Sequence, residues 1–316
     1  MMRAVVPIAA LALCVAACDD PAPSSETTTT GASTGEQAGS TSGPGSSTIV
    51  PGVSTTTVGG VSSTTDVLDD SSSASSGEPP STGFDPATVL FEEDFEDAPP
   101  GTTPPGWDSF VGYVVNMNNE PGGQAFALAD DTRARSGSQA LHVVGGSTPA
   151  MLTRPLPRGT ERIHVRAYVW LTEGLGQNPG NNHETLLGIR GSIGQANEEV
   201  RFGEIKGVVG TNEVPSDDIS PTMDQWGRGP RIEAGQWNCI EVAFVATADV
   251  HEVRAWRDGE EVHRVNDPAQ WNNGALGTDF LTGKFREFII GWHSFSNVDN
   301  ELWVDDLVVA TERVGC

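Results

Sequence analysis

Basic residues and tyrosine are scarce in this chain of 316 residues. Lys and Arg number 18 against 43 Asp and Glu, which gives a formal net charge of −25 at pH 7, and there are only two tyrosines. A strongly acidic chain is a poor partner for nucleic acids and for anionic membrane surfaces. The two tyrosines leave few phenolic groups for acid–base chemistry.

Long apolar runs are lacking at the N-terminus. The run Ala4–Ala17 follows the positive Arg3, as in a secretory signal, and is too short to span a bilayer as a stable helix. It ends in Val-Ala-Ala-Cys, which resembles a bacterial lipobox. We therefore predict a lipoprotein signal peptide over residues 1–17, acylation of Cys18, and export to the periplasm or cell surface. The alternative is an ordinary secretory signal followed by a chance cysteine.

Cysteine is equally rare, with four in the chain. Cys14 leaves with the predicted signal and Cys18 carries the lipid, so Cys239 and Cys316 are the two that remain. In an oxidising compartment two leftover cysteines are expected to pair. We predict that this disulfide pins the C-terminus to an interior strand and stabilises the fold by about 4 kcal/mol in the chain-entropy model.

Aromatic residues are missing before Phe84. Residues 18–83 are dominated by Ser, Thr, Gly and Pro, so they have no apolar surface to bury and are predicted to form a disordered tether. Residues 84–316 hold 35 acidic and 17 basic residues, a net charge of −18. This part is long enough for one domain with a large core.

The domain shows no helix of convincing length, whereas short alternating or apolar runs recur between Gly, Pro, Asn and Asp clusters. This pattern predicts an all-β fold built as an antiparallel two-sheet β-sandwich. Asp258-Gly259 is predicted to form a hairpin turn. The predicted strands are Val89–Phe95, Ala140–Val144, Ile163–Leu171, Thr185–Ile189, Glu199–Ile205, Trp237–Val245, Val253–Arg257, Glu261–Val265, Phe285–Trp292 and Leu302–Ala310.

The clearest alternation runs over Arg162–Leu171. Its aliphatic residues fall on one face, which predicts a strand packed on a core. The other face carries Arg162, His164, Arg166, Tyr168 and Trp170. Cations and aromatics in a row suit a sugar-binding surface; the alternative is an exposed strand face with its aromatics partly buried under a loop.

Several segments resemble the secreted cellulose-induced proteins of fungi and their bacterial relatives. They include EDFED (93–97), HVRAYVWL (164–171), NHETLLGI (182–189), GQWNCIEVAF (235–244) and RVGC (313–316). The resemblance covers nearly all of residues 89–316. It implies a concanavalin A-like jelly roll, similar in fold to glucuronan and alginate lyases, with a concave sheet that binds a polysaccharide. It also implies the Cys239–Cys316 bridge.

The resemblance assigns roles to individual residues. His183 is the candidate base, while Arg166 and Arg201 are candidates for neutralising a sugar carboxylate. The substrate-binding residues expected from the strand pattern or the resemblance are His164, Tyr168, Trp170, Asn182, Asn212 and His293. A structural calcium ion with oxygen ligands is implied at Glu96, Ser136, Gln139 and one of Asp305 and Asp306.

Phe295 departs from the family pattern, which has a tyrosine there. A phenyl ring cannot transfer a proton, so a lyase would need Tyr113, Tyr168 or His293 as its acid. The spaced carboxylates of glycoside hydrolases, zinc-ligand spacings, a nucleophile elbow and a phosphate loop are all lacking in the sequence.

The sequence thus predicts a monomeric, lipid-anchored protein that binds a polysaccharide and touches the membrane only through its anchor. Two alternatives are a polysaccharide lyase that cleaves a uronic-acid polymer by β-elimination and a non-catalytic cell-envelope adhesin.

Overall fold

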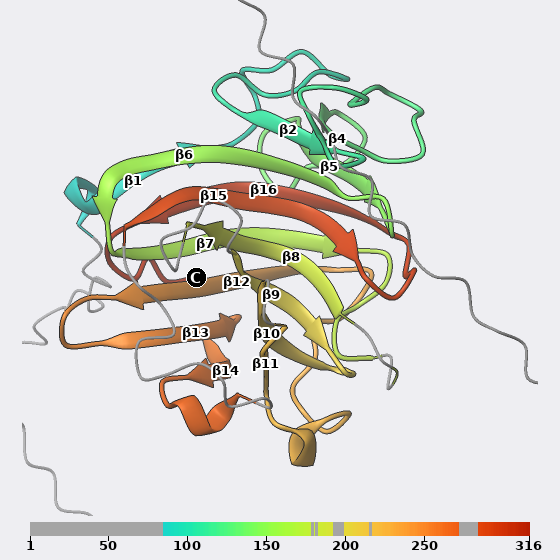
Figure 1. Ribbon diagram of the computed structural model, residues 1–316. Helices are drawn as coiled ribbons and strands as arrows, with labels where there is room; N and C mark the ends of the chain where they lie inside the picture. Colours follow the sequence, from blue (N-terminus) through green and yellow to red (C-terminus); the bar gives the residue numbers. More distant parts are fainter. Residues whose placement is uncertain (1–84, 178–179, 181–182, 192–198, 215–216, 272–283) are drawn as a thin grey trace, which may run out of the picture. The chain divides into compact units, whose positions relative to one another are not determined.

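A computed structural model describes residues 85–177, 180, 183–191, 199–214, 217–271 and 284–316 (Figure 1). The predicted signal peptide and tether lie outside the described residues. The strands are β1 (Val89–Glu93), β2 (Asp108–Val111), β3 (Val114–Val115), β4 (Phe126–Asp130), β5 (Ala140–Gly145), β6 (Ala150–Thr160), β7 (Arg162–Leu171), β8 (His183–Arg190), β9 (Glu199–Ile205), β10 (Val208–Val214), β11 (Ile219–Ser220), β12 (Trp237–Ala246), β13 (His251–Arg257), β14 (Glu260–Val265), β15 (Phe285–Ser294) and β16 (Asn300–Ala310). Three 3-10 turns accompany them: η1 (Pro86–Thr88), η2 (Met223–Gln225) and η3 (Pro268–Gln270).

The strands form two antiparallel sheets that pack as a sandwich. Sheet A has the order β14-β13-β12-β7-β16-β5-β4, with β1 paired to β16. Sheet B has the order β11-β10-β9-β8-β15-β6-β2-β3. The predicted all-β, two-sheet fold is confirmed. Within the described part of the chain, no helix is long and apolar enough to cross a membrane.

Ten of these strands coincide with or overlap the ten predicted runs, and β9 has the same bounds as its prediction. The predicted hairpin joins β13 to β14, with Asp258 at φ 50° and Gly259 at φ 86°. Strands β2, β3, β4, β6, β10 and β11 were not predicted. In β6 the prolines Pro155 and Pro157 resemble loop residues, because proline cannot donate to a ladder. The pairing with β15 shifts register between Phe285 and Glu287, beside Pro155.

The core lies between the two sheets. On β7 the residues alternate between half-buried and buried, and the buried set is the aliphatic one. These side chains share one cluster with Phe288, Ile290 and Trp292 of β15 in sheet B. The hydrophobic face of each sheet is thereby removed from water, which leaves the opposite faces for polar side chains.

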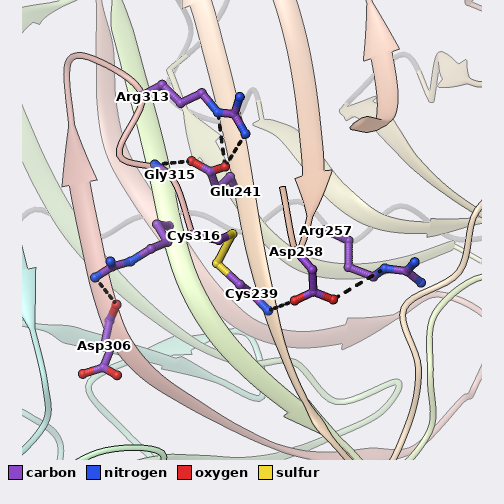
Figure 2. The surroundings of a disulfide bond; sticks show 9 residues. Cys239, Glu241, Arg257, Asp258, Asp306, Arg313, Gly315 and Cys316 are labelled. Atoms are coloured by element: carbon purple, nitrogen blue, oxygen red, sulfur yellow. Dashed lines mark hydrogen bonds and ion pairs between the residues drawn. A yellow bond between two sulfur atoms is a disulfide. The ribbon is translucent and has the colours of Figure 1, made fainter. Parts of the chain in front are cut away.

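The C-terminal tail after β16 is tied to β12, as Figure 2 shows. Cys239 and Cys316 form a disulfide with 6.0 Å between their Cα atoms, which confirms the predicted pairing. The buried Glu241 accepts hydrogen bonds from Arg313 Nη2 (2.6 Å) and from the backbone N–H of Gly315 (2.7 Å). The tail therefore lies against the outer face of sheet A.

Candidate functional site

Four of the predicted site residues lie on sheet B. His183 begins β8, Arg201 lies on β9, Asn212 on β10 and His293 on β15. The core contains Val200 and Phe202 on either side of Arg201, and Trp292 before His293, so Arg201 and His293 lie on the opposite, outer face. Asn182 lies outside the described residues.

The other predicted groove residues lie on the outer face of sheet A. They all belong to β7 and are His164, Arg166, Tyr168 and Trp170. Because the aliphatic face of β7 packs into the core, this polar face points away from sheet B. Arg166 therefore cannot hold the same sugar carboxylate as Arg201 beside His183. The prediction of one groove containing both sets of residues is wrong.

Neighbouring side chains cover much of the outer face of β7. The guanidinium carbon of Arg133 lies 3.7 Å from the centre of the Trp170 ring, and that of Arg135 lies 3.3 Å from the Tyr168 ring. Arg166 donates through Nη2 to a carbonyl oxygen of β16 (3.2 Å). The face thus corresponds to the alternative interpretation, a strand face partly covered by other segments.

Arg166 lines a different cavity, of about 450 Å³, at the edge of sheet A. Arg154 contributes a second guanidinium. The carboxylates that line this cavity are Glu92, Glu93, Asp94, Asp97 and Asp306. Five carboxylates against two guanidinium groups make it an unfavourable site for an anionic polymer.

Two adjoining cavities form a groove on the outer face of sheet B, called here the sheet B groove. One, of about 280 Å³, is lined by His183, Asn212 and Asp217, and the other, of about 140 Å³, by Tyr113, Arg190 and His293. Arg201 and Phe295 line both cavities, so the two adjoin at these side chains. The structure thereby brings together four predicted residues from the four strands β8, β9, β10 and β15.

His183 is oriented by Asp217. Its Nδ1 lies 3.3 Å from Asp217 Oδ1, whereas its Nε2 is buried without a hydrogen-bond partner in the described part of the protein. Burial lowers the pKa of His183 below its ordinary value, against the opposing effect of the Asp217 carboxylate. At neutral pH we therefore assign a neutral ring with its proton on Nδ1. The lone pair on Nε2 is then available for a proton, as general-base catalysis requires.

Arg201 is held by Glu199, two residues earlier on β9. Its Nε and Nη2 both lie 2.5 Å from Glu199 Oε2, and Arg190 Nε lies 2.6 Å from Glu199 Oε1. Burial raises the pKa of Glu199, but the charges of Arg201 and Arg190 outweigh this and lower it below the ordinary value. One ionised carboxylate thus orients two guanidinium groups at the centre of the groove.

Tyr113 reaches the groove from the turn between β2 and β3. Its hydroxyl lies 3.2 Å from Nε2 of His293, and the two rings meet edge to face. His293 is itself buried, and burial together with the nearby Arg201 charge lowers its pKa to about 4. Phe295 contacts the other side of the His293 ring, at 4.0 Å between centroids, and is 51% exposed.

The residues predicted to bind calcium gather around the loop before β5. The Glu96 carboxylate accepts the N–H groups of Ser138 (2.7 Å) and Gln139 (2.8 Å). Ser136 Oγ donates to Asp306 Oδ1 (2.7 Å), and Asp305 Oδ2 accepts the N–H of Ser136 (3.1 Å). The loop is therefore anchored through the predicted ligands themselves.

Among the described residues, no group of three or more His, Cys, Asp or Glu side chains is placed to hold a metal ion, but this set contains one unpartnered oxygen. Gln139 Oε1 is a buried acceptor with no hydrogen-bond partner among the described residues, and it belongs to the oxygen type that calcium prefers. Arg135 Nη1 lies 2.6 Å from Asp306 Oδ2 and would compete with an ion for that oxygen. Asp305 is fully buried under backbone donors, so of the two aspartates Asp306 fits a ligand better.

Comparison with protein families identifies the chain. Residues 104–312 match the core domain of the Cip1-like, polysaccharide-lyase-like family, and the protein belongs to this family. The predicted family relationship is confirmed. A search of curated proteins finds no match.

Among solved structures, one shows the same fold, and two others have lower similarity. Cellulose-induced protein Cip1 is 22% identical, with a TM-score of 0.53 over 72% of this chain and 99% of that one. A sialidase is 10% identical, with a TM-score of 0.39 over 71% of this chain and 18% of that one. The CBM22-1 xylan-binding domain of Paenibacillus barcinonensis Xyn10C is 10% identical, with a TM-score of 0.35 over 72% and 96%.

Some groove residues were missed in the sequence. Arg190 and Glu199 stand at the end of β8 and the start of β9 and resemble ordinary charged strand ends. Their signal was the spacing Glu199-Val200-Arg201, which places a carboxylate and a guanidinium on one face of a strand. Tyr113 was only one of three possible acids, because nothing in the sequence shows that β2 lies near β15.

Proposed function

We propose that this protein binds a polysaccharide in the sheet B groove. The observation that carries the proposal is that the two cavities adjoin at Arg201 and Phe295, which line both, and so form an extended site. Guanidinium groups and ring faces suit the hydroxyl, carboxylate and C–H surfaces of sugars. Membership of a polysaccharide-lyase-like family and the likeness to Cip1 support the same substrate class.

Affinity electrophoresis of the purified protein through gels that contain glucuronan, alginate, pectin or a neutral glucan tests this proposal. We expect retarded migration in at least one polymer and about 10-fold weaker binding for Arg201→Ala. The matched control is Arg264→Ala, which removes an arginine of β14 on sheet A. Unretarded migration in every gel, or equal weakening in both variants, would contradict the proposal.

A second candidate function is β-elimination on a uronic-acid polymer. The neutral His183, which lines the cavity beside Arg201 and has Nδ1 on Asp217 and an unpartnered Nε2, favours it. Arg201 would hold the sugar carboxylate and so make the neighbouring C–H more acidic, while His183 Nε2 takes that proton.

Ultraviolet absorbance of the unsaturated product measures this reaction. We expect product from one of the uronic-acid polymers, and at least a 100-fold slower rate for His183→Ala. The control variant His251→Ala removes a histidine of β13 on sheet A and should leave the rate unchanged. If His183→Ala binds the polymer but neither it nor the wild type forms product, the groove is a binding site only.

We further propose that the domain is exported and anchored through an acylated Cys18, as the signal segment and lipobox-like residues suggest. A calcium ion on Glu96, Ser136, Gln139 and Asp306 is proposed as a structural ligand of the loop before β5. The unpartnered Gln139 Oε1 supports it.

A further inference from the structure

Tyr113 occupies an unusual position on the wall of the sheet B groove. It lies in the turn between β2 and β3 with φ at 66°, a left-handed conformation that is uncommon for residues other than glycine. The side chain is 62% exposed, yet its hydroxyl is fixed between His293 Nε2 (3.2 Å) and the carbonyl oxygen of Ser147 (3.3 Å). An exposed phenol with both hydrogen-bonding directions defined is preorganised to meet a ligand.

β-Elimination also requires a proton donor for the leaving oxygen, in addition to the base His183. When the C–O bond to the leaving sugar breaks, its oxygen needs a proton. Arg190 and Arg201 hold their protons too tightly to donate them, Glu199 is ionised, and the Asp217 carboxylate orients His183. Among the described side chains of the groove, the Tyr113 hydroxyl is an exposed group that carries an exchangeable proton.

We infer that Tyr113 is the proton donor to the leaving glycosidic oxygen and that His293 is its positioning residue. The inference rests on the second candidate function proposed above. It assigns the two proton transfers to either side of Arg201, with His183 in one cavity, Tyr113 in the adjoining one, and Arg201 common to both.

The step balances without a further reactant. His183 Nε2 takes the proton from the carbon next to the carboxylate, and the C–H electron pair forms a carbon–carbon double bond. The bond from the adjacent carbon to the glycosidic oxygen breaks, and that oxygen takes the bonding pair together with the phenolic proton of Tyr113. Exchange with water then returns both side chains to their starting states.

His293 fits the positioning role through its burial. It is 6% exposed and its Nε2 lies 3.2 Å from the Tyr113 hydroxyl, so it can act on the proton transfer through Tyr113. In the neutral tautomer with the proton on Nε2, the ring donates to the phenolic oxygen and stabilises the phenolate that forms when Tyr113 gives up its proton. Ser147 O accepts the phenolic proton until the substrate replaces it.

The two tyrosines of the chain provide a matched test in the full-length protein. Tyr113→Phe removes the proposed donor, whereas Tyr168→Phe removes the hydroxyl of a ring on sheet A that Arg135 covers. We expect Tyr113→Phe to slow product formation on glucuronan, alginate or pectin by about 100-fold or more, with gel retardation by the same polymer within about threefold of wild type. Tyr168→Phe should match the wild type in both assays.

His293 is tested by a conservative pair of variants. We expect His293→Gln, whose amide can still donate to the phenol, to retain at least about 10-fold more activity than His293→Ala at equal thermal stability.

The outcomes separate this inference from the proposals beneath it. Product at the wild-type rate from Tyr113→Phe overturns the inference alone, as does a loss of binding that matches the loss of rate. A wild-type protein that binds a polymer without forming product overturns both the inference and the lyase function and leaves polysaccharide binding. Absence of binding in every gel overturns all three.

Discussion

Among single residues, Glu184 is an ionisable group buried beneath the sheet B groove. It follows His183 on β8, is 2% exposed, and faces Glu204 in the β8–β9 register. Ser294 Oγ donates to its Oε1 (3.2 Å), while Oε2 is buried without a hydrogen-bond partner in the described part of the chain. Burial and the Glu204 charge raise the pKa of Glu184 to about 8. The carboxyl is therefore protonated at neutral pH.

Glu184→Gln should increase stability at high pH. An acid whose pKa is raised on folding destabilises the folded state progressively as pH rises from its unfolded pKa of about 4.3 towards its folded pKa. The variant should therefore gain stability over wild type between about pH 4.3 and 8, and the difference should level off above that. Thermal melts across this range measure it, with Glu260→Gln, an exposed carboxylate on β14, as control. A difference that is constant with pH would contradict the assignment.

At the residue scale, the sequence and family resemblance identified His183, Arg201, Asn212 and His293, which the structure gathers in one groove. The prediction that Arg166 shares this groove was wrong. Alternation along a strand shows which residues share a face but not which sheet contains the strand. The Tyr113–His293 contact joins residues 180 positions apart and follows only from the pairing of β2 with β6 and of β6 with β15.

At the scale of elements, the regular strands were predictable and the interrupted ones were not. Alternation marks β7, whose inner face is buried throughout, and the Asp-Gly turn marks the hairpin of β13 and β14. Strand β6 was obscured by its prolines, and β2 and β3 are only four and two residues long. Tyr113 lies in the turn between β2 and β3, so these least predictable elements form one wall of the sheet B groove.

The C-terminal tail is held to β12 through three of its residues, Arg313, Gly315 and Cys316. Cys316→Ser removes the covalent one and leaves the contacts of Arg313 and Gly315 with Glu241. We expect a loss of about 2–4 kcal/mol in the free energy of unfolding, since the bridge closes a loop with a sequence separation of 77. Urea unfolding measures the change, and Cys239→Ser should match it. An unchanged unfolding midpoint in both variants would show that the noncovalent contacts suffice.

The loop before β5 gives the test of calcium. If Asp306 and Gln139 hold an ion, millimolar calcium should raise the melting temperature of the wild type, and a chelator should reverse the rise. Asp306→Asn should abolish the response by removing the charge that Arg135 now shares. Asp258→Asn, in the turn between β13 and β14, serves as the control. A melting temperature that calcium leaves unchanged would contradict the proposed site.

At the scale of the whole molecule, the domain has a net negative charge, whereas its sheet B groove contains the basic residues Arg190 and Arg201. The domain carries a net charge of −18, which repels an anionic polymer at long range. Salt screens exposed charges over about 8–10 Å, so it should weaken this repulsion more than the close contacts in the groove. Binding of a uronic-acid polymer would therefore depend on local geometry rather than on overall attraction.

The proposed lipid anchor at Cys18 sets the cellular location at which the sheet B groove would bind its polymer. Cys18 and Cys14 lie four residues apart, but only Cys18 follows the lipobox-like Val-Ala-Ala. Because an anchor of more than one acyl chain binds membranes stably, a Cys18 that carries such an anchor should keep the protein in the membrane fraction after high-salt washing. Cys18→Ser should lose incorporation of labelled fatty acid and leave the washed membranes, whereas Cys14→Ser should behave as wild type. Equal fractionation and labelling of the two variants would mean that Cys18 is a chance cysteine behind an ordinary secretory signal.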